Sequence, residues 1–558
     1  MRRAGLKSAG IAAFLVFAAI FAYFPVLKFS FTNWDDPIWV THNLFIRHLD
    51  PMSFKWMFFG AWLGTWTPVT WLSLSLDYRL DGLDPFVYHL HNLILHSTVT
   101  VLFYLVLRRL GALLTPPPAK GMPLPGEHPV RSAAWMAALL FAVHPLHAET
   151  VAWVSDRIDL LCAVFYLASV LCHLYAPPHG GDKHCGTASY TFLCLALASK
   201  PTAVSLPFVL ALLDQWILRK PWGSYWDQLT QKAGALVPAG LIALLTLVTR
   251  SGAQDLRSLQ AVPLDYRVMN ACQSLWFYAV KTLAPVGLCP VIPMFRDRTF
   301  STPYLSAALG CVLVAAAAFY FRDKKPYLAV APALYGVMLL PTLGLVGSGS
   351  QAAADRYTYL PGMVLFLSAA LGLRQVFGRF RIFLTVAVLA LAVVLVWATR
   401  AQASYWKDSR SLWGQELRLY PVNYASAYSG LAEAYLEEGN PGNALSLYDM
   451  GAKASPGMAY LYNGKAGALL ALGRDAEAVA ACQDALARSA PLDEQSGWSH
   501  AIQDILDTRS GKREGADTER SQALLSAPGN AFLHFDLGEK YSEHSMLDAA
   551  LAQYQTAI

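Results

Sequence analysis

Long apolar segments separated by short loops fill most of the chain before Trp406. The first, "IAAFLVFAAIFAYFPVL", follows Met1-Arg2-Arg3, and 55% of the 558 residues are hydrophobic while 15% are charged. Soluble domains carry roughly a quarter charged residues, and about 20 apolar residues cross the hydrocarbon core of a bilayer. The sequence therefore predicts an all-α, polytopic membrane bundle with about eleven spans. These expected spans lie near residues 8–27, 90–107, 132–146, 157–175, 189–199, 201–218, 234–250, 303–321, 327–346, 358–377 and 381–399.

Two apolar stretches need a separate interpretation. The first could pass for a signal peptide, but no small-x-small cleavage site follows it and further spans come later, so we expect a retained membrane helix. The stretch 268–293 contains Lys281, Pro285 and Pro290. Since broken backbone at membrane depth is tolerated only against protein or water, we expect a re-entrant or interfacial piece there.

Basic residues set the expected orientation. The N-terminus and the short loops with Arg108-Arg109, Arg219-Lys220, Lys324-Lys325 and Arg379 are basic, as cytoplasmic loops are. Eleven crossings then place the C-terminal portion outside, and a full crossing by 268–293 would reverse this. No N-x-[ST] sequon occurs in the chain. This favours a bacterial inner membrane with a periplasmic C-terminal portion over an endoplasmic reticulum membrane with a lumenal one.

The part of the chain beyond Trp406 is repetitive. Tyr435, Gly439, Ala444, Tyr448 and Pro456 have counterparts 34 residues later at Leu469, Gly473, Ala478, Cys482 and Ala490, and the pattern resumes around Gly511 and Ser545. A 34-residue period with these residue types is the tetratricopeptide signature, in which stacked helix pairs bury a continuous core. We expect a membrane domain over 1–402 and an α-solenoid of about four repeats over 403–558, the last one incomplete at Ile558.

Polar side chains suited to catalysis gather in loops on the expected outer side. The first outer loop, 28–89, carries adjacent Asp35 and Asp36 in "FTNWDDPIWVTHN", and later loops carry Arg157, Lys200 and Arg356. Transfer of a sugar from a lipid phosphate needs a base for the acceptor hydroxyl and cations for the departing phosphate. Two adjacent carboxylates disfavour each other's ionisation, so one can have a pKa suited to proton transfer. We expect Asp35 or Asp36 as the base and the three cations at the phosphate.

Each of these groups also has a plainer explanation. An Asp-Asp-Pro stretch can be a solvated turn or a helix N-cap, and Arg356 beside Asp355 can be a surface pair. His144, His147 and Glu149 have spacings that suit a metal, but hydrogen-bonded groups at a helix end explain them more simply, and His89 can be packed. Eight cysteines without a C-x-x-C pair argue against a zinc site or a disulfide scaffold. The chain has no basic tract that would indicate nucleic acid.

Five separated motifs resemble one known family. They are "NWDDPIWVTHN", "TWTPVTWLSLSLDYRLDGLDPFVYHLHNLILH", "HPLHAETVAWVSDRIDLL", "ASKPTAVSLPFVLALLDQW" and "SQAAADRYTYLP". Followed by tetratricopeptide repeats, they look like the transmembrane-and-tetratricopeptide family, whose animal members are O-mannosyltransferases with a GT-C membrane fold.

The resemblance implies roles for particular residues. Asp35 and Asp36 would hold the position of the catalytic carboxylate. Asp355, Arg356 and Tyr357 would be the Asp-Arg-Tyr motif, and His144, Pro145, His147 and Glu149 complete a His-Pro-x-His-x-Glu motif. Ile158 departs from the family, which has a basic residue there. The resemblance also implies a polyprenyl- or dolichyl-phosphate sugar as donor, plausibly mannose, with no cofactor and no metal.

Three functions are then weighed. The first is an integral membrane glycosyltransferase that moves a sugar from a lipid-phosphate donor to a hydroxyl of a protein acceptor bound by the repeats. The alternative is a non-catalytic membrane-anchored scaffold, which would need only one span. A transporter for a lipid-linked sugar would want mid-membrane charges and an inverted repeat, and the sequence has neither. We expect the glycosyltransferase.

Overall fold

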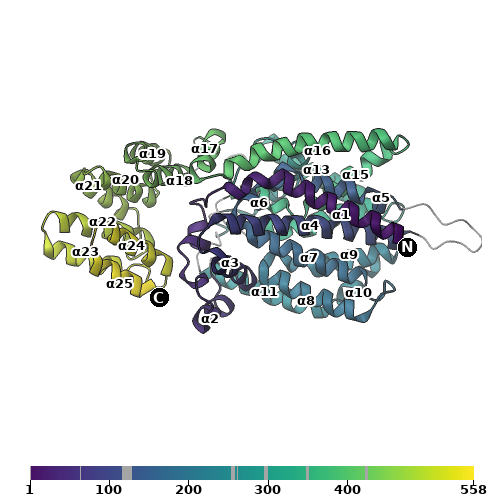
Figure 1. Cartoon of the computed structure of the whole chain (residues 1–558), viewed down its shortest axis with the longest axis horizontal. Coiled ribbons are helices and arrows are strands. Elements are labelled where there is room, and N and C mark those ends of the chain that lie inside the picture. Colours follow the sequence, from purple (N-terminus) through teal and green to yellow (C-terminus); the bar gives the residue numbers. More distant parts are fainter. Residues whose placement is uncertain are drawn as a thin grey trace, which may run out of the picture. The chain divides into compact units, whose positions relative to one another are not determined.

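The chain folds into two compact units of helices (Figure 1). The computed structural model describes residues 2–62, 64–115, 128–252, 258–260, 262–293, 300–346, 351–421 and 425–557. The membrane unit comprises Met1–Phe29 and Phe45–Trp406, and the repeat unit comprises Ser30–Leu44 and Lys407–Ile558. The short segment after the first helix, with Asp35 and Asp36, thus belongs to the repeat unit.

Helices make up nearly all of the membrane unit. Their bounds are α1 Arg2–Tyr23, α2 Pro51–Phe59, α3 Pro68–Asp81, α4 Pro85–Leu114, α5 Pro129–Ala142, α6 Ala148–Ala152, α7 Arg157–Leu174, α8 Lys183–Ser199, α9 Leu206–Ile217, α10 Tyr225–Thr230, α11 Ala233–Gly252, α12 Leu264–Leu283, α13 Thr302–Phe321, α14 Tyr327–Leu339, α15 Gly362–Phe377 and α16 Arg381–Ala403. Strands β1 (Ile292–Pro293) and β2 (Gln351–Ala353) pair antiparallel. The predicted outer loop 28–89 contains α2, α3 and the start of α4.

Six helical segments have the length and apolar composition needed to cross a bilayer, which confirms a multi-pass membrane protein. They are Leu6–Lys28, Pro85–Leu114, Val154–Leu174, Ala233–Ser251, Thr302–Phe321 and Arg381–Trp406. Shorter apolar helices occupy Pro129–Ala142, Pro201–Ile217, Tyr327–Thr342 and Gly362–Phe377. Large apolar side chains such as Leu309 and Val393 are exposed on these helices, as lipid-facing residues are. The total of eleven crossings stays a prediction.

Two of the predicted apolar stretches contain prolines, and in both of them a helix ends shortly before a proline. α8 ends at Ser199, and Lys200 adopts extended backbone with φ −152° and ψ 132°, because the residue before a proline disfavours the helical region. In contrast, α12 is one unbroken helix over Leu264–Leu283. Pro285 and Pro290 lie beyond the helix end, and the expectation of a re-entrant or interfacial piece over 268–293 stays a prediction.

The first and last long helices of the membrane unit run in the same direction. They lie side by side with their C-terminal ends together (Figure 1), and Arg400 Nη2 donates to the Phe21 carbonyl at 2.6 Å. The chain therefore leaves this unit at the same end after α1 and after α16.

The repeat unit is a series of antiparallel helix pairs, as the 34-residue period predicted. A preceding helix and four pairs have these bounds: α17 Ser409–Leu419, α18 Ala425–Glu437, α19 Pro441–Ala454, α20 Ala459–Ala471, α21 Asp475–Leu486, α22 Glu494–Arg509, α23 Arg513–Leu525, α24 Ala531–Glu543 and α25 Leu547–Ala557. Gly439, Gly473 and Gly511 end the first helix of each pair with φ near +70° to +78°, which glycine adopts without strain. Ser545 takes this conformation in the fourth repeat with φ 61°.

Candidate active site

A buried ion pair joins two loops that are far apart in the sequence. Glu149 begins α6, and Arg356 lies in the 3₁₀ turn Asp355–Thr358. The Arg356 backbone N–H donates to Glu149 Oε2 at 3.0 Å, and its Nη1 donates to Oε1 at 2.5 Å. Burial raises the pKa of Glu149 although Arg356 opposes this shift. Removing only one partner of such a buried ion pair destabilises the fold, because the remaining charge stays buried without its partner.

A second ion pair lies beside the first. Lys200, in the bend between α8 and α9, contacts Asp159 Oδ2 through its Nζ at 2.5 Å. Burial lowers the pKa of Lys200, but Asp159 and Asp156 together raise it by more, so the ammonium stays charged. Asp156 is buried next to this pair, and its Oδ2 accepts no hydrogen bond from the residues that the structure describes.

The two cations line one narrow cleft. Its volume is about 20 Å³, and its lining includes Asp159, Lys200, Thr202, Thr342, Arg356 and Tyr357. The Tyr357 ring lies close to both cations, with the Arg356 guanidinium 5.1 Å and the Lys200 ammonium 6.0 Å from its centroid. The structure thus brings together two of the three predicted phosphate-binding cations, Lys200 and Arg356.

The cleft lies at the end of the unit where α1 and α16 finish. Tyr23, the last residue of α1, donates through its hydroxyl to the His144 carbonyl at 2.8 Å, and Thr399 of α16 donates to the Val143 carbonyl at 2.7 Å. These bonds tie the turn before α6, and hence Glu149, to the C-terminal ends of both helices. The polar side chains gather at one end, as the sequence predicts.

Asp355 is buried and begins the 3₁₀ turn that contains Arg356. Its Oδ2 accepts the backbone N–H of Cys289 at 3.1 Å, while its Oδ1 accepts no hydrogen bond within the described part of the chain. Burial raises the pKa of Asp355 well above its ordinary value, and Glu149 adds to this shift. Asp355 therefore favours the protonated form and positions the turn with Arg356.

Arg157, the third predicted cation, is held inside the protein. It is fully buried and pairs with Asp77, with Nη2 to Oδ2 at 2.7 Å. Its other bonds go to Asn92, to Ser73 Oγ at 3.0 Å and to the Tyr88 carbonyl at 2.7 Å. These contacts join α3, α4 and α7, and a role for Arg157 at the phosphate stays a prediction.

The predicted histidines lie in the interior behind the cleft. His144 Nε2 bonds to the Thr282 carbonyl at 3.1 Å, and its Nδ1 accepts the Leu146 N–H at 3.2 Å. These are the hydrogen-bonded groups at a helix start that were the simpler explanation. His147 is buried against Phe141 and Tyr359, and His89 is buried against Phe29.

The Asp-Asp pair lies in the repeat unit, just before a short helical turn at Pro37–Thr41. Asp36 is buried, and its Oδ2 accepts the Thr32 backbone N–H at 2.8 Å and the Thr32 hydroxyl at 3.1 Å. Asp35 is partly exposed. The structure thus gives the two carboxylates different surroundings, and their catalytic role stays a prediction.

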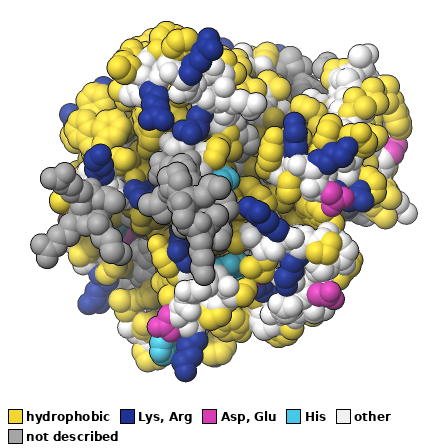
Figure 2. Space-filling view, turned by 90° about the vertical axis from the view of Figure 1, so that its right-hand side faces the viewer, with side chains coloured by type: hydrophobic (Ala, Val, Ile, Leu, Met, Phe, Trp, Pro, Cys, Tyr) yellow, Lys and Arg dark blue, Asp and Glu magenta, His cyan; other side chains and the backbone are white. Residues whose placement is uncertain are grey.

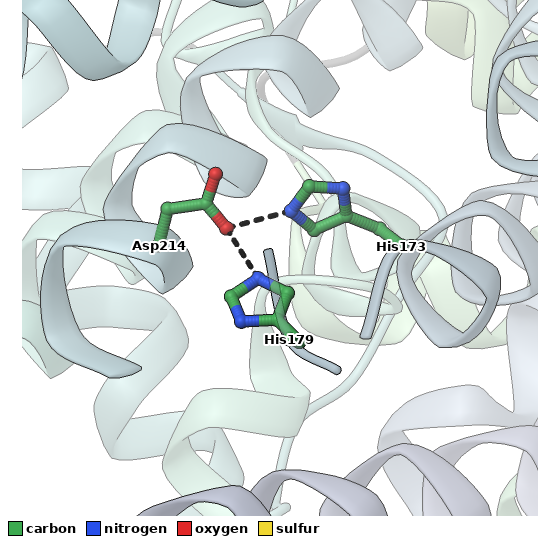
Figure 3. Close-up of side chains that lie close together, drawn as sticks. All are labelled: His173, His179 and Asp214. Carbon is green, nitrogen blue, oxygen red and sulfur yellow. Dashed lines mark hydrogen bonds and ion pairs between the residues drawn. The ribbon is translucent and has the colours of Figure 1, made fainter. Parts of the chain in front are cut away.

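A separate cluster of possible metal ligands occurs at the opposite end of α7. His173, His179 and Asp214 place their ligand atoms within 4.8 Å of one another (Figure 3). Both imidazoles hydrogen-bond to Asp214 Oδ1, at 2.7 and 2.8 Å, and the Lys232 ammonium contacts Oδ2 at 2.6 Å. An ammonium already balances the carboxylate, so hydrogen bonds and an ion pair account for the grouping of the three side chains around Asp214. His144, His147 and Glu149 form no such cluster among the described residues.

Comparison with known proteins supports the family that the motifs indicated. Protein O-mannosyl-transferase TMTC4 of Homo sapiens is 25% identical over 470 residues, which cover 74% of this chain and 62% of that protein. The chain is thus similar in sequence to TMTC proteins over most of its length. Human TMTC1 is 24% identical over 516 residues, 82% of this chain and 56% of that protein, and Xenopus laevis tmtc2 is 35% identical over 129 residues, 23% of this chain and 12% of that protein.

The chain spans roughly three fifths of the length of TMTC4 and TMTC1. No family model matches it. Among solved structures, a crystal structure of MamA is 17% identical and covers 26% of this chain and 84% of its own, with a TM-score of 0.20.

Sequence reasoning missed the carboxylates that hold the two cations. The sequence predicts no role for Asp159, and it indicates Glu149 only as a possible metal ligand, a group at a helix end or part of the His-Pro-x-His-x-Glu motif. Pairing could have been suspected from burial alone, since lysine and arginine are almost never fully buried unless paired.

Proposed function

We propose that this protein is a membrane glycosyltransferase that moves a sugar, plausibly mannose, from a polyprenyl- or dolichyl-phosphate donor to a hydroxyl group of a protein acceptor. The single observation that carries this proposal is the cleft shared by Lys200 and Arg356 at the end of the membrane unit. The names of the relatives, protein O-mannosyl-transferases, support the reaction class.

The cleft as it stands has room for about one water molecule, judged by its 20 Å³. A phosphate must therefore displace something. The groups best placed to yield are Asp159 and Glu149, which hold Lys200 and Arg356 through 2.5 Å contacts. In this proposal the two carboxylates keep the cations in place until the anionic donor arrives and takes over the bonds.

A large apolar groove supports a lipid-linked donor. It has a volume of about 630 Å³ and lies between α12, α13, α14 and α15, with Trp276, Val314, Tyr335 and Val364 in its lining. Gly336 of α14 lines the groove, and Met338 of the same helix lines the cleft. An isoprenoid chain in the groove would thus lead along α14 to a phosphate between the cations.

The proposed transfer involves one bond made and one broken at the anomeric carbon. The acceptor oxygen bonds to this carbon, and the bond from the carbon to the phosphate oxygen breaks. The acceptor proton goes to a carboxylate, and the lipid phosphate leaves toward Lys200 and Arg356. We assign the base to Asp35, because Asp35 is partly exposed whereas Asp36 is buried.

We further propose that the cleft faces the side of the membrane away from the cytoplasm. The face of the membrane unit at the N-terminal end of α1 carries many Lys and Arg side chains and few Asp and Glu (Figure 2). Such an excess marks the cytoplasmic side. The cleft, at the other end of α1, would then open to the periplasm or to the endoplasmic reticulum lumen.

The direct test is reconstitution of the full chain in liposomes with a radiolabelled polyprenyl-phosphate mannose and an acceptor protein extract. We expect label in Ser or Thr residues of protein, and loss of that label in the double variant Asp35→Asn, Asp36→Asn. Unchanged transfer by that variant would remove the proposed base. A scaffold without activity would give no label from any lipid-phosphate sugar.

A further inference from the structure

The segment that carries the Asp-Asp pair is bound by the repeats at two places. The first is Asn33, whose backbone N–H donates to Ser409 Oγ at 2.9 Å and whose Nδ2 donates to the Gly430 carbonyl at 2.9 Å. Its Oδ1 accepts the indole N–H of Trp413 at 2.7 Å. An amide that uses both a donor and its acceptor on separate helices is held in position and orientation.

The structure around this first contact leaves no room for a larger residue. A Cβ at position 430 would lie 2.2 Å from Nε1 of Trp413, so glycine lets α17 and α18 approach closely. The Trp34 ring adds an edge-to-face contact with the Trp413 ring, with centroids 5.9 Å apart. The residues that bind Asn33 are thus themselves held in place by close packing.

The second contact is His42, at the far end of the segment. Its Nδ1 lies 2.6 Å from Asp536 Oδ1 of α24, and its ring contacts the Phe535 ring at a centroid distance of 5.4 Å. Burial raises the pKa of Glu437, and the His42 ring opposes this shift. Burial raises the pKa of Glu433 to about 7, and Asp536 adds to that shift. His42 therefore lies against an acidic face of the repeats.

These contacts connect the first repeat with the fourth. α18 and α24 are the first helices of their pairs, and the first helices contact one another in succession from α18 through α20 and α22 to α24. Asn33 and His42 are nine positions apart in the sequence, which an extended chain spans with at most about 30 Å. The helical turn at Pro37–Thr41 shortens that reach, so the curve of the solenoid must bring its two ends close to the segment.

We propose that the repeats bind Ser30–Leu44 of their own chain as an internal ligand, and that Asn33 and His42 are positioning residues for the Asp35–Asp36 pair between them. The catalytic consequence rests on the proposed function. In this arrangement an acceptor held on the same face of the solenoid is presented next to the proposed base. Binding of the segment also fixes the distance between the first and the fourth repeat.

The test is hydrogen exchange of residues 31–43 in the full chain in lipid nanodiscs, measured together with sugar transfer. Asn33→Ala, Asn33→Asp and Asp536→Asn are compared with Asp517→Asn, a control on α23 whose exposed carboxylate pairs with Arg520. Each lost hydrogen bond is worth about 1 kcal/mol, so we expect exchange in 31–43 to rise about fivefold in Asn33→Asp and Asp536→Asn. In Asn33→Ala, which loses two side-chain bonds, we expect a rise of about thirtyfold, and the control should stay unchanged.

Exchange and transfer report on different claims. Unchanged exchange in 31–43 in Asn33→Ala, Asn33→Asp and Asp536→Asn would overturn the internal ligand, whatever the activity. Asn33→Asp keeps the acceptor for Trp413 and loses the donor for Gly430, so it separates loss of one bond from loss of the fold. Faster exchange with no sugar transfer in the unaltered protein would instead leave the internal ligand standing and contradict the proposed function.

Discussion

Replacing Arg356 with lysine separates charge from geometry in the cleft. The guanidinium reaches Glu149 through Nη1, while the backbone N–H of the same residue makes a second bond at 3.0 Å that the substitution keeps. Lysine retains the positive charge but is a point charge without the planar fork that suits phosphate oxygens. The fold should therefore survive, and the stabilisation of the leaving phosphate should not.

The expected loss in kcat follows from the hydrogen bonds to the phosphate that lysine cannot make. Removing one preorganised donor from a developing anion costs about 2.7–4 kcal/mol, which is a loss of about 10²-fold to 10³-fold in kcat. The assay is transfer from a polyprenyl-phosphate sugar in liposomes under saturating acceptor, with thermal unfolding in detergent measured in parallel.

A matched control is Arg410→Lys in the repeat unit. Arg410 pairs with Glu438 at 3.2 Å with both side chains about half exposed, and such surface pairs contribute under about 1 kcal/mol. We expect unchanged kcat and stability there. If Arg356→Lys folded normally and kept kcat within about twofold of the unaltered protein, Arg356 would not hold the phosphate and the reasoning would be refuted.

Three further predictions concern the acids and the absence of a metal. Asp35→Asn should lower kcat by about 10² to 10⁴, the usual contribution of a general base, whereas Asp36→Asn should cost less because its amide oxygen can still accept from Thr32; equal losses in steady-state assays would contradict this ranking. Burial raises the pKa of Asp355, so the folded protein loses stability as the pH rises and this carboxyl would have to ionise. The variant Asp355→Asn should therefore show a smaller fall in melting temperature between about pH 5 and pH 8 than the unaltered protein. An equal fall in both proteins would argue against a protonated Asp355. Two cations suffice for a monophosphate, so a chelator should leave transfer unchanged, and loss of activity restored by a divalent cation would disprove that expectation.

Much of the fold could be predicted because each signal is local. Long apolar segments predict which helices contact lipid, and the 34-residue period predicts the helix pairs of the repeat unit. The period also predicts glycines such as Gly439, which end helices with positive φ. The break at Lys200-Pro201 was also visible, since proline acts on its immediate neighbour. The bounds of α12 were not predicted, because its prolines lie a few residues beyond Leu283 and the apolar stretch 268–293 does not show where the helix ends.

The candidate site was predictable in its cations and not in their partners. Arg356 and Lys200 stand in loops whose polarity contrasts with the surrounding apolar helices, and that contrast is readable from the sequence. Their partners Glu149 and Asp159 come from other loops, so only the packing of the helices shows the pairing. The same holds for Arg157, which looks like its neighbours in sequence but points into the bundle, and for Asn33, whose partners lie almost four hundred residues away.

The most direct measurement of the central claim is mass spectrometry of membrane-associated and exported proteins from cells with and without the gene, and from cells that carry only the Arg356→Lys variant. The account predicts that particular Ser or Thr residues lose one sugar mass in the deletion, and that the variant restores little of it. Identical sugar masses on those proteins in all three strains would contradict the account.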